Sequence, residues 1–87
     1  MSFPSEGTDE FWQLYRAMPV DTRQLARRNY RRWQSDPFHP SLRFKKVSGE
    51  NWSVRIGLNY RALGRFMVDG TFVWEWIGSH ADYDRRA

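Results

Sequence analysis

The sequence predicts an α+β fold, in which two N-terminal helices pack on one face of an antiparallel, twisted β-sheet of about four strands. Apolar residues recur with helical spacing in the first half of the chain, and from Leu42 onward the spacing changes to every second residue. The connections between the later segments are short, which favours antiparallel neighbours. With 87 residues, the chain is expected to form one domain, residues 1–87.

The first helix is expected to begin at Thr8 or Asp9, because either side chain can cap the free amides of a helix start. One apolar face then follows at i, i+3, i+4 and i+7, made of Phe11, Leu14, Tyr15 and Met18. Pro19 marks the break after this helix.

The second helix is expected to begin at Asp21 or Thr22 and to run to about Ser35. Pro37 and Pro40 prevent it from continuing. Its expected core contacts are Leu25, Ala26, Tyr30 and Trp33.

Four strands are expected, over residues 42–47, 51–57, 60–68 and 71–78. Residues 2–4, "SFP", are a weak signal for a further short edge strand. Asp69-Gly70 predicts a two-residue hairpin that pairs Val68 with Thr71.

This register assigns side chains to two faces of the sheet. The face expected under the helices carries Val54, Ile56, Tyr60, Ala62, Phe66, Val68, Val73 and Ile77. The open face carries Arg55, Arg61, Leu63, Arg65, Met67, Phe72, Trp74, Trp76 and His80. A slip of one residue would exchange the two sets.

Arg55 and Arg61 are expected to lie opposite each other, with His80 at the same end of the sheet. Two facing arginines repel, and a bound anion between them would relieve this. Arginine also suits bidentate contacts to phosphate oxygens. The alternative is that both side chains extend into water or pair with an acid, namely Glu50, Asp82 or Asp84.

Charge points to an anionic partner, since the formal net charge is +4 and the isoelectric point is about 10.0, although an ordinary basic protein can have the same values. Arg23, Arg27 and Arg31 form one stripe on the second helix, and Arg28 and Arg32 a second. The stripes could follow a phosphate backbone, remain solvated or bind an acidic protein segment. Trp74 and Trp76 could stack on bases or pack against a partner or the chain end.

Several classes of protein are excluded or disfavoured. There is no cysteine, so disulfides and thiolate metal sites are excluded, and two histidines give little support for a metal site. No cofactor motif is present. "MSFPSEG" does not resemble a signal peptide, and no apolar run is long enough to span a membrane. We therefore expect a cytoplasmic protein without a metal or cofactor.

Three segments resemble the RelE/ParE superfamily of bacterial toxin–antitoxin toxins: "HPSLRFKKVSG", "WSVRIGLNYRALG" and "WIGSHADYD". They occur in this order behind two helices, and the ending is most similar to members that carry a histidine followed by a tyrosine. The resemblance implies a small α+β domain, silenced by a cognate antitoxin. RelE-like members are metal-free endoribonucleases that cut mRNA on the ribosome, whereas ParE-like members inhibit DNA gyrase.

The resemblance implies catalytic roles for Arg55, Arg61, His80 and Tyr83. Asp82 either orients His80 or is solvated. The residues expected to contact RNA are Lys45, Lys46, Arg65, Trp74 and Trp76, although strand-edge lysines also protect against aggregation. Ser53 stands where some cleaving members have a second lysine. The implied reaction is attack of a 2′-hydroxyl on the adjacent phosphate, and the alternatives are a gyrase inhibitor, a non-catalytic toxin-like binding protein and an RNA-binding adaptor.

Overall fold

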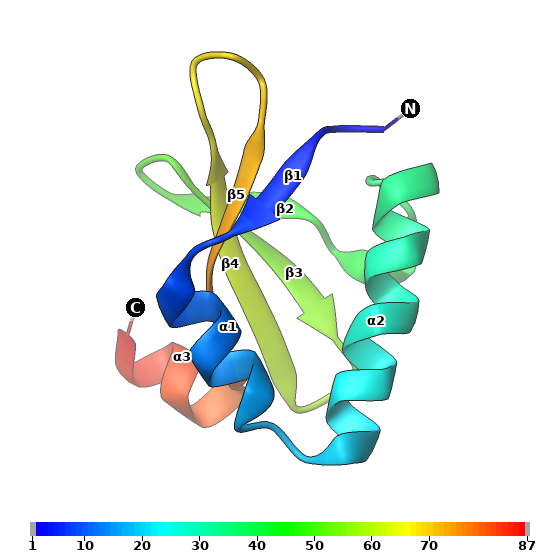
Figure 1. Cartoon of the computed structure of the whole chain (residues 1–87), viewed down its shortest axis with the longest axis vertical. Helices are drawn as coiled ribbons and strands as arrows, with labels where there is room; N and C mark the ends of the chain where they lie inside the picture. The colour runs from blue at the N-terminus through cyan, green and yellow to red at the C-terminus, as the bar shows by residue number, and fades with distance from the viewer. Residues whose placement is uncertain (1, 87) are drawn as a thin grey trace.

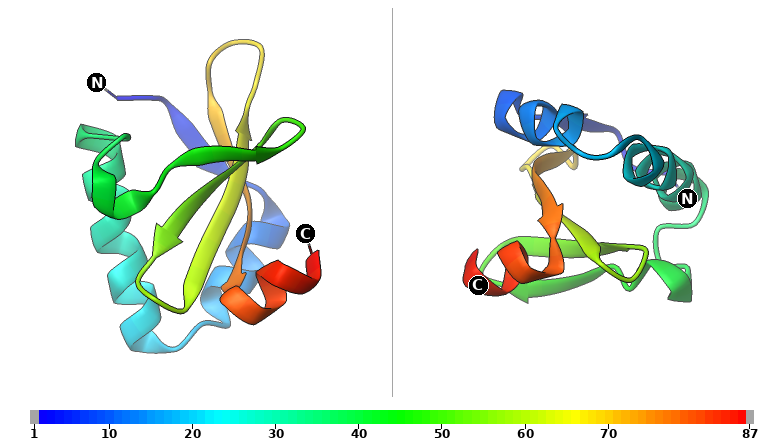
Figure 2. Two further views of the ribbon diagram at one scale, coloured as in Figure 1. Left: turned by 180° about the vertical axis from the view of Figure 1, so that it is seen from behind. Right: turned by 90° about the horizontal axis from the view of Figure 1, so that it is seen from below.

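The computed structural model describes residues 2–86 and has the expected α+β architecture (Figure 1). Helices α1 and α2 lie on one side of the sheet, and α3 lies apart from them, directly after β5 (Figure 2). The elements in chain order are β1 (Ser5–Gly7), α1 (Asp9–Arg16), α2 (Val20–Ser35), the 3₁₀ helix η1 (Pro40–Leu42), β2 (Lys45–Ser48), β3 (Asn51–Ile56), β4 (Tyr60–Phe66), β5 (Phe72–Ser79) and α3 (His80–Arg86).

The sheet has five strands in the order β1-β5-β4-β3-β2, one more than the expected four. The added strand is β1, which pairs in parallel with β5, so the sheet is mixed rather than wholly antiparallel. The amide of Phe72 donates to the carbonyl of Pro4 over 2.8 Å, and that of Thr8 to Trp74 over 2.9 Å. The weak edge-strand signal at residues 2–4 thus lay just before a real strand, at the edge of the sheet.

Both predicted helices are present, with boundaries close to those expected. The hydroxyl of Thr8 accepts a hydrogen bond from the amide of Phe11 over 3.1 Å, so Thr8 caps α1. Helix α2 begins at Val20, slightly earlier than expected, and buries Ala26 and Trp33.

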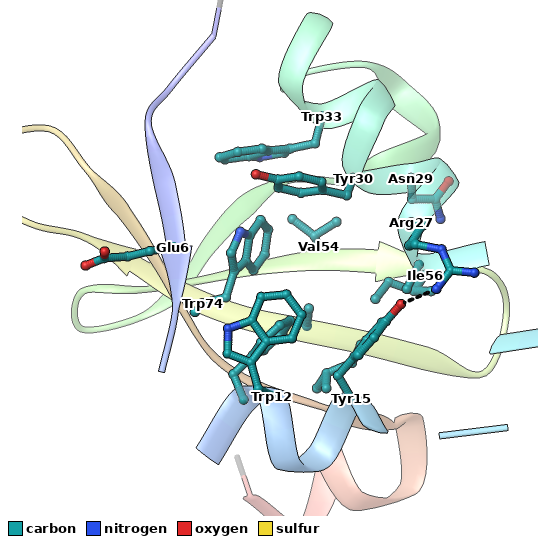
Figure 3. A pocket seen from close by; sticks show the side chains of 15 residues that line it. Glu6, Trp12, Tyr15, Arg27, Asn29, Tyr30, Trp33, Val54, Ile56 and Trp74 are labelled. Carbon is teal, nitrogen blue, oxygen red and sulfur yellow. Dashed lines mark hydrogen bonds between the residues drawn. The ribbon is translucent and has the colours of Figure 1, made fainter. Parts of the chain in front are cut away.

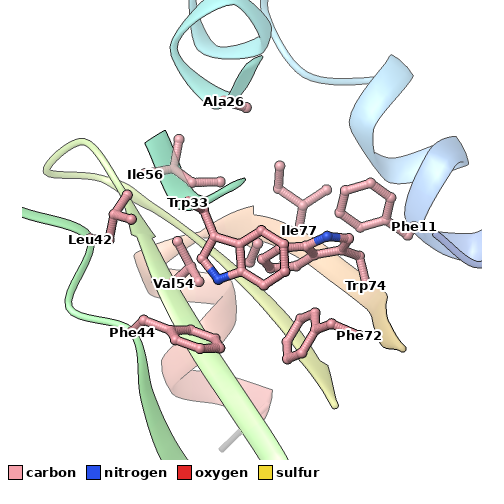
Figure 4. Packing of buried hydrophobic residues seen from close by; sticks show 11 residues of the cluster. Phe11, Ala26, Trp33, Leu42, Phe44, Val54, Ile56, Phe72, Trp74 and Ile77 are labelled. Carbon is pink, nitrogen blue, oxygen red and sulfur yellow. The ribbon is translucent and has the colours of Figure 1, made fainter. Parts of the chain in front are cut away.

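An aromatic cluster forms the core between the helices and the sheet (Figure 4). Trp33 of α2 lies at its centre and has no exposed surface. Its ring lies 5.3 Å from Phe72, 5.1 Å from Trp74 and 5.8 Å from Phe44 between centroids. Contacts between large rings thus hold the sheet against α2.

The prediction of a two-residue turn between β4 and β5 is wrong. The strands pair Phe66 with Phe72, and the amide of Met67 donates to the carbonyl of Thr71 over 2.7 Å, which leaves a three-residue loop. Gly70 adopts φ +90°, the positive value that such a loop requires at its last position. The register at this end of the hairpin is therefore one residue away from the predicted one.

A β-bulge restores the predicted register further along the same pair of strands. Gly64 pairs with Trp74, whereas the preceding Leu63 pairs with Trp76, so that Glu75 is the extra residue of β5. Beyond the bulge, Arg61 lies opposite Gly78, as predicted. The two irregularities cancel, and the end of the sheet that carries His80 has the expected pairing.

Between the turn and the bulge, the assignment of the β5 side chains to faces was wrong, whereas Phe66 of β4 packs against the core as predicted. Phe72 and Trp74 belong to the core and not to the open face, because the shift of one residue reverses the direction of each side chain. Val68, which was expected under the helices, is fully exposed in the turn, and Val73 is absent from the core cluster. Val54, Ile56, Ala62 and Ile77 are buried as predicted.

In the part of the chain that the structure describes, no helix is both long and apolar enough to cross a membrane.

Candidate active site

A polar pocket of about 230 Å³ opens where β3, β4 and the start of α3 meet. Arg55 and Arg61 face each other across the β3–β4 pair, and His80 joins them, as the register predicted. Of the described residues, seven line the pocket and none of them is acidic: Arg43, Arg55, Gly57, Leu58, Tyr60, Arg61 and His80. The pocket is therefore a positively charged hollow at the end of the sheet.

The two facing arginines are not neutralised by carboxylates among residues 2–86. Arg55 donates from Nε to the carbonyl of Gly57 over 3.1 Å. Arg61 donates from Nη1 to the hydroxyl of Ser53 over 3.3 Å and from Nε to His80 Nδ1 over 3.4 Å. Both guanidinium groups are thus held in place by neutral partners and keep their charge available for an anion.

The acids that could have neutralised them have other partners. Glu50 lies 3.7 Å from the Nζ of Lys46, and Asp82 pairs with Arg85. Asp84 approaches His80 instead, with 3.6 Å between Oδ2 and Nε2. The alternative in which these acids pair with Arg55 or Arg61 is therefore not what the structure shows.

His80 is the first residue of α3, and its backbone amide donates to the carbonyl of Asn59 over 2.6 Å. This bond ties the end of β5 to the β3–β4 loop and fixes the ring at the pocket. A guanidinium can only donate, so Nδ1 must carry a lone pair toward Arg61. The ring proton then lies on Nε2, which faces Asp84. A neutral imidazole in this state can accept a proton at Nδ1.

Tyr83 lies one turn after His80 on α3, and its ring contacts both His80 and Arg61. Its ring lies 6.1 Å from the His80 ring, and the two are nearly parallel at 21°. The Arg61 Cζ lies 5.3 Å from the centroid of the Tyr83 ring, within the range of a cation–π contact. Tyr83 also contacts Trp76, at 6.5 Å between centroids. The ring of Tyr83 therefore helps to fix both Arg61 and His80.

Asp82 does not orient His80. Hydrogen bonds from the guanidinium of Arg85, and then from the hydroxyl of Ser79, hold the pKa of Asp82 below its ordinary value of 3.8. The amide of Asp82 in turn donates to the Ser79 hydroxyl over 3.1 Å. Asp82 thus stabilises the first turn of α3, and Asp84 is the carboxylate beside the histidine.

Two of the five residues expected to contact RNA are buried. Trp74 is 7% exposed and packs against Trp33 in the core. Trp76 is 6% exposed and contacts Tyr83 of α3. The bulge at Glu75 places the two tryptophans on opposite faces of the sheet, and neither ring is available for stacking on a base.

The three basic residues of that set are on the surface. Lys45 and Lys46 are exposed on the edge strand β2, and Lys45 lies opposite Ser53 in the β2–β3 pairing. Arg65 is also exposed and makes an ion pair with Glu75, with 3.3 Å between Nε and Oε2. None of the three lines the pocket.

Sequence reasoning missed Arg43, which also lines the pocket. It is the single non-glycine residue with positive φ in the described chain, at φ +47°. Arg43 caps η1, a 3₁₀ helix that the sequence did not reveal. Pro37 and Pro40 in front of it indicated only that the second helix ends, not this backbone angle.

A second, apolar cleft of about 280 Å³ lies between α1, α2 and the sheet (Figure 3). Aromatic rings from both helices and from β5 dominate its lining: Phe11, Trp12, Tyr15, Tyr30, Trp33 and Trp74. Arg27 of α2 reaches across to the hydroxyl of Tyr15 on α1, donating over 2.9 Å. The arginine stripes of α2 make no ion pair with any described acid, so this side of the molecule is both apolar and cationic.

Comparison with protein families decides the relationship. The model of the ParE-like toxin domain matches residues 21–85. The chain belongs to this family. The resemblance to the RelE/ParE superfamily is thereby confirmed. A search of curated proteins by sequence gives no significant match.

Solved structures share the fold at low sequence identity. A chain of the RelBE2 toxin–antitoxin complex of Mycobacterium tuberculosis has a TM-score of 0.73 at 15% identity, over 92% of this chain and 100% of that one. The RelB–RelE complex of Methanococcus jannaschii gives 0.71 at 18% identity, over 93% and 98%. The YoeB/ParE toxin of Agrobacterium tumefaciens gives 0.69 at 17% identity, over 88% and 98%. The ParE-like chain therefore has the RelE fold.

Proposed function

We propose that this ParE-like protein is the toxin of a toxin–antitoxin system and acts as a metal-free endoribonuclease that cleaves mRNA in the cytoplasm, on the ribosome. The observation that carries the proposal is the acid-free pocket in which Arg55, Arg61 and His80 converge. A phosphodiester is the anion that such a pocket suits, because arginine binds phosphate oxygens bidentately.

RNA supplies the nucleophile, the 2′-hydroxyl beside each phosphate. His80 accepts the proton of that hydroxyl at Nδ1, once Arg61 has turned from the ring to the phosphate. The 2′-oxygen forms a bond to phosphorus, and the bond from phosphorus to the 5′-oxygen breaks. The leaving oxygen takes a proton from water, and the imidazolium of His80 returns its proton to the hydroxide that remains, which regenerates the base. The products are a 2′,3′-cyclic phosphate and a 5′-hydroxyl, so that atoms and charge balance without a metal.

Arg55 and Arg61 act on the charge that grows on the phosphate oxygens during this step. Their neutral partners leave the full positive charge facing the pocket. Tyr83 is a positioning residue, since its ring contacts both Arg61 and His80. Asp84 stabilises the imidazolium after proton transfer, because it lies beside Nε2. Lys45 and Lys46 supply further cationic contacts to the RNA backbone.

The test is mRNA integrity over time in a bacterial translation extract after addition of the purified protein. A set of discrete fragments, absent from an extract treated with His80→Ala, supports the proposal. Intact mRNA with both proteins contradicts it. A supercoiling assay with purified DNA gyrase, run in parallel, detects the alternative ParE-like activity, which the family match favours.

The proposal includes a cognate antitoxin as partner. Two of the structurally similar chains come from complexes of a toxin with its antitoxin. The apolar cleft between α1 and α2 suits an acidic segment that inserts apolar side chains, because Arg28 and Arg31 of α2 are exposed and make no ion pair with any described acid. Charge reversal at Arg28 and Arg31 is expected to weaken capture of a short acidic protein encoded beside this chain. Undiminished capture would place that partner elsewhere on the surface.

A further inference from the structure

Arg43 has an unusual backbone for its residue type. It adopts φ +47° and ψ +44°, the left-handed region that non-glycine residues other than asparagine and aspartate rarely occupy. Such a conformation costs free energy and persists only where the surrounding structure enforces it, often at a binding site. The residue therefore needs an explanation.

The surroundings of Arg43 enforce this geometry. Leu42 before it has no exposed surface, and Phe44 after it is 7% exposed, so both neighbours are anchored in the core. The amide of Arg43 donates to the carbonyl of Pro40 over 3.3 Å, which closes the 3₁₀ helix. With its neighbours fixed on both sides, Arg43 cannot change its backbone angles without disturbing the core.

The side chain of Arg43 has no partner in the described part of the chain. It makes no ion pair or hydrogen bond there, although it lines the pocket with Arg55, Arg61 and His80. Three arginines thus line a hollow of about 230 Å³, and no described acid lines it. Repulsion among them favours release of Arg43 into solvent unless an anion binds.

We infer that Arg43 binds a second phosphate of the substrate, on the nucleotide next to the one that is cleaved. This rests on the proposed function of the same pocket. Arg55 and Arg61 lie directly opposite each other in the β3–β4 pair and are suited to one phosphate. Arg43 enters from a different segment, the loop after η1, and extends the cationic surface along the chain of a single-stranded RNA. It selects for a polynucleotide over a lone phosphate.

The test is the salt dependence of binding to a short single-stranded RNA in which every 2′-hydroxyl is methylated, so that cleavage cannot occur. Each phosphate contact on a single strand contributes a slope of about −0.7 to log K against log salt. Arg43→Gly suits the positive φ and removes the whole side chain, including the guanidinium. It is expected to lower affinity severalfold and to reduce the slope by about 0.7. Arg43→Lys is expected to keep the slope.

Arg16→Ala is the matched control, because Arg16 is an exposed arginine at the end of α1 and does not line the pocket. Arg43→Asn is a second variant that tolerates the left-handed region, if the glycine variant fails to fold. An unchanged slope in both neutral variants, or no binding of RNA by the wild type, overturns the inference. If the wild type binds with the expected slopes but leaves mRNA intact in the translation extract, the nuclease proposal fails and the role of Arg43 in binding RNA stands.

Discussion

Arg61 donates from Nε to Nδ1 of His80 over 3.4 Å, and this contact joins the start of β4 to the first residue of α3. It couples the phosphate-binding group to the proposed base, because Arg61 must leave Nδ1 for the histidine to accept a proton. The same arginine donates a hydrogen bond to the hydroxyl of Ser53 and makes a cation–π contact with the ring of Tyr83. These three contacts make Arg61 the centre of a small network.

Replacement of His80 by alanine should lower RNA cleavage by about 10²–10⁴-fold, the usual contribution of a positioned general base. The measurement is the initial rate on a labelled RNA, with thermal unfolding followed in parallel. His39→Asn is the control, because asparagine retains the N-cap of η1 while the imidazole is lost. Cleavage by His80→Ala at the wild-type rate would mean that the ring is structural.

Arg61→Ala should reduce both activity and stability. It leaves the hydroxyl of Ser53, which has no exposed surface, without its hydrogen-bond partner. An unsatisfied buried polar group costs about 1–3 kcal/mol. The double variant Ser53→Ala/Arg61→Ala should regain part of the free energy of unfolding, measured in urea, but none of the activity. Recovery of activity in the double variant would show that Arg61 acts only through folding.

Tyr83→Phe should retain activity within a few-fold, whereas Tyr83→Ala should lose about 2- to 30-fold. The reason is that the ring, rather than the hydroxyl, contacts Arg61 and His80. A cation–π contact contributes about 0.5–2 kcal/mol, which corresponds to this range. Single-turnover rates on the same RNA measure it. A loss in Tyr83→Phe as large as in Tyr83→Ala would instead assign proton transfer to the hydroxyl.

The lowered pKa of Asp82 predicts that the free energy of unfolding depends on pH through this residue of α3. Its pKa is lowered in the folded state by Arg85 and then Ser79, so its carboxylate stabilises the fold above its ordinary pKa of 3.8. That contribution is lost as the pH falls through the lower folded-state pKa. Urea unfolding at a series of pH values should show a smaller loss in this acidic window for Asp82→Asn than for the wild type. Parallel curves for the two proteins would exclude this role.

Gly78 leaves room for the ring of Trp76, on which Tyr83 of the site packs. A Cβ at this position would lie 2.5 Å from Cζ2 of Trp76, which in turn contacts Tyr83. Gly78→Ala should therefore cost about 1–3 kcal/mol of stability, as overpacking usually does, and should displace α3. Gly49→Asn is the control, since a Cβ at Gly49 would meet no atom within 4 Å and asparagine tolerates its positive φ of +50°. Equal stability of Gly78→Ala and the wild type would contradict this packing.

The positions of the site residues were predicted more accurately than the assignment of side chains to the two faces of the sheet. The loop signal between β3 and β4 places Arg55 opposite Arg61 correctly. The predicted position of His80 beside Asn59 is also correct, but only because two unpredicted irregularities of the β4–β5 pair cancel. The three-residue turn and the bulge at Glu75 each shift the register by one residue, in opposite senses. Alternation alone contains no signal for either, because the aromatic residues of β5 suit both faces.

Other features depend on tertiary contacts that local patterns do not encode. Strand β1 is three residues long and forms only because β5 offers a free edge. Arg43 reaches the pocket through a backbone angle enforced by two buried neighbours. Asp84 rather than Asp82 lies beside His80, because α3 begins at the histidine and places the residue four positions later on the same side.

The proposed chemistry requires a 2′-hydroxyl next to the cleaved phosphate. The most direct measurement therefore uses two RNAs that differ by one atom, with a ribose or a 2′-deoxyribose at a mapped cleavage position, incubated with the wild-type protein under conditions in which it cuts. The account predicts cleavage of the first RNA, with a 2′,3′-cyclic phosphate at the new end, and no cleavage of the second at that position. Equal cleavage of both RNAs, or a 3′-hydroxyl end, would contradict it.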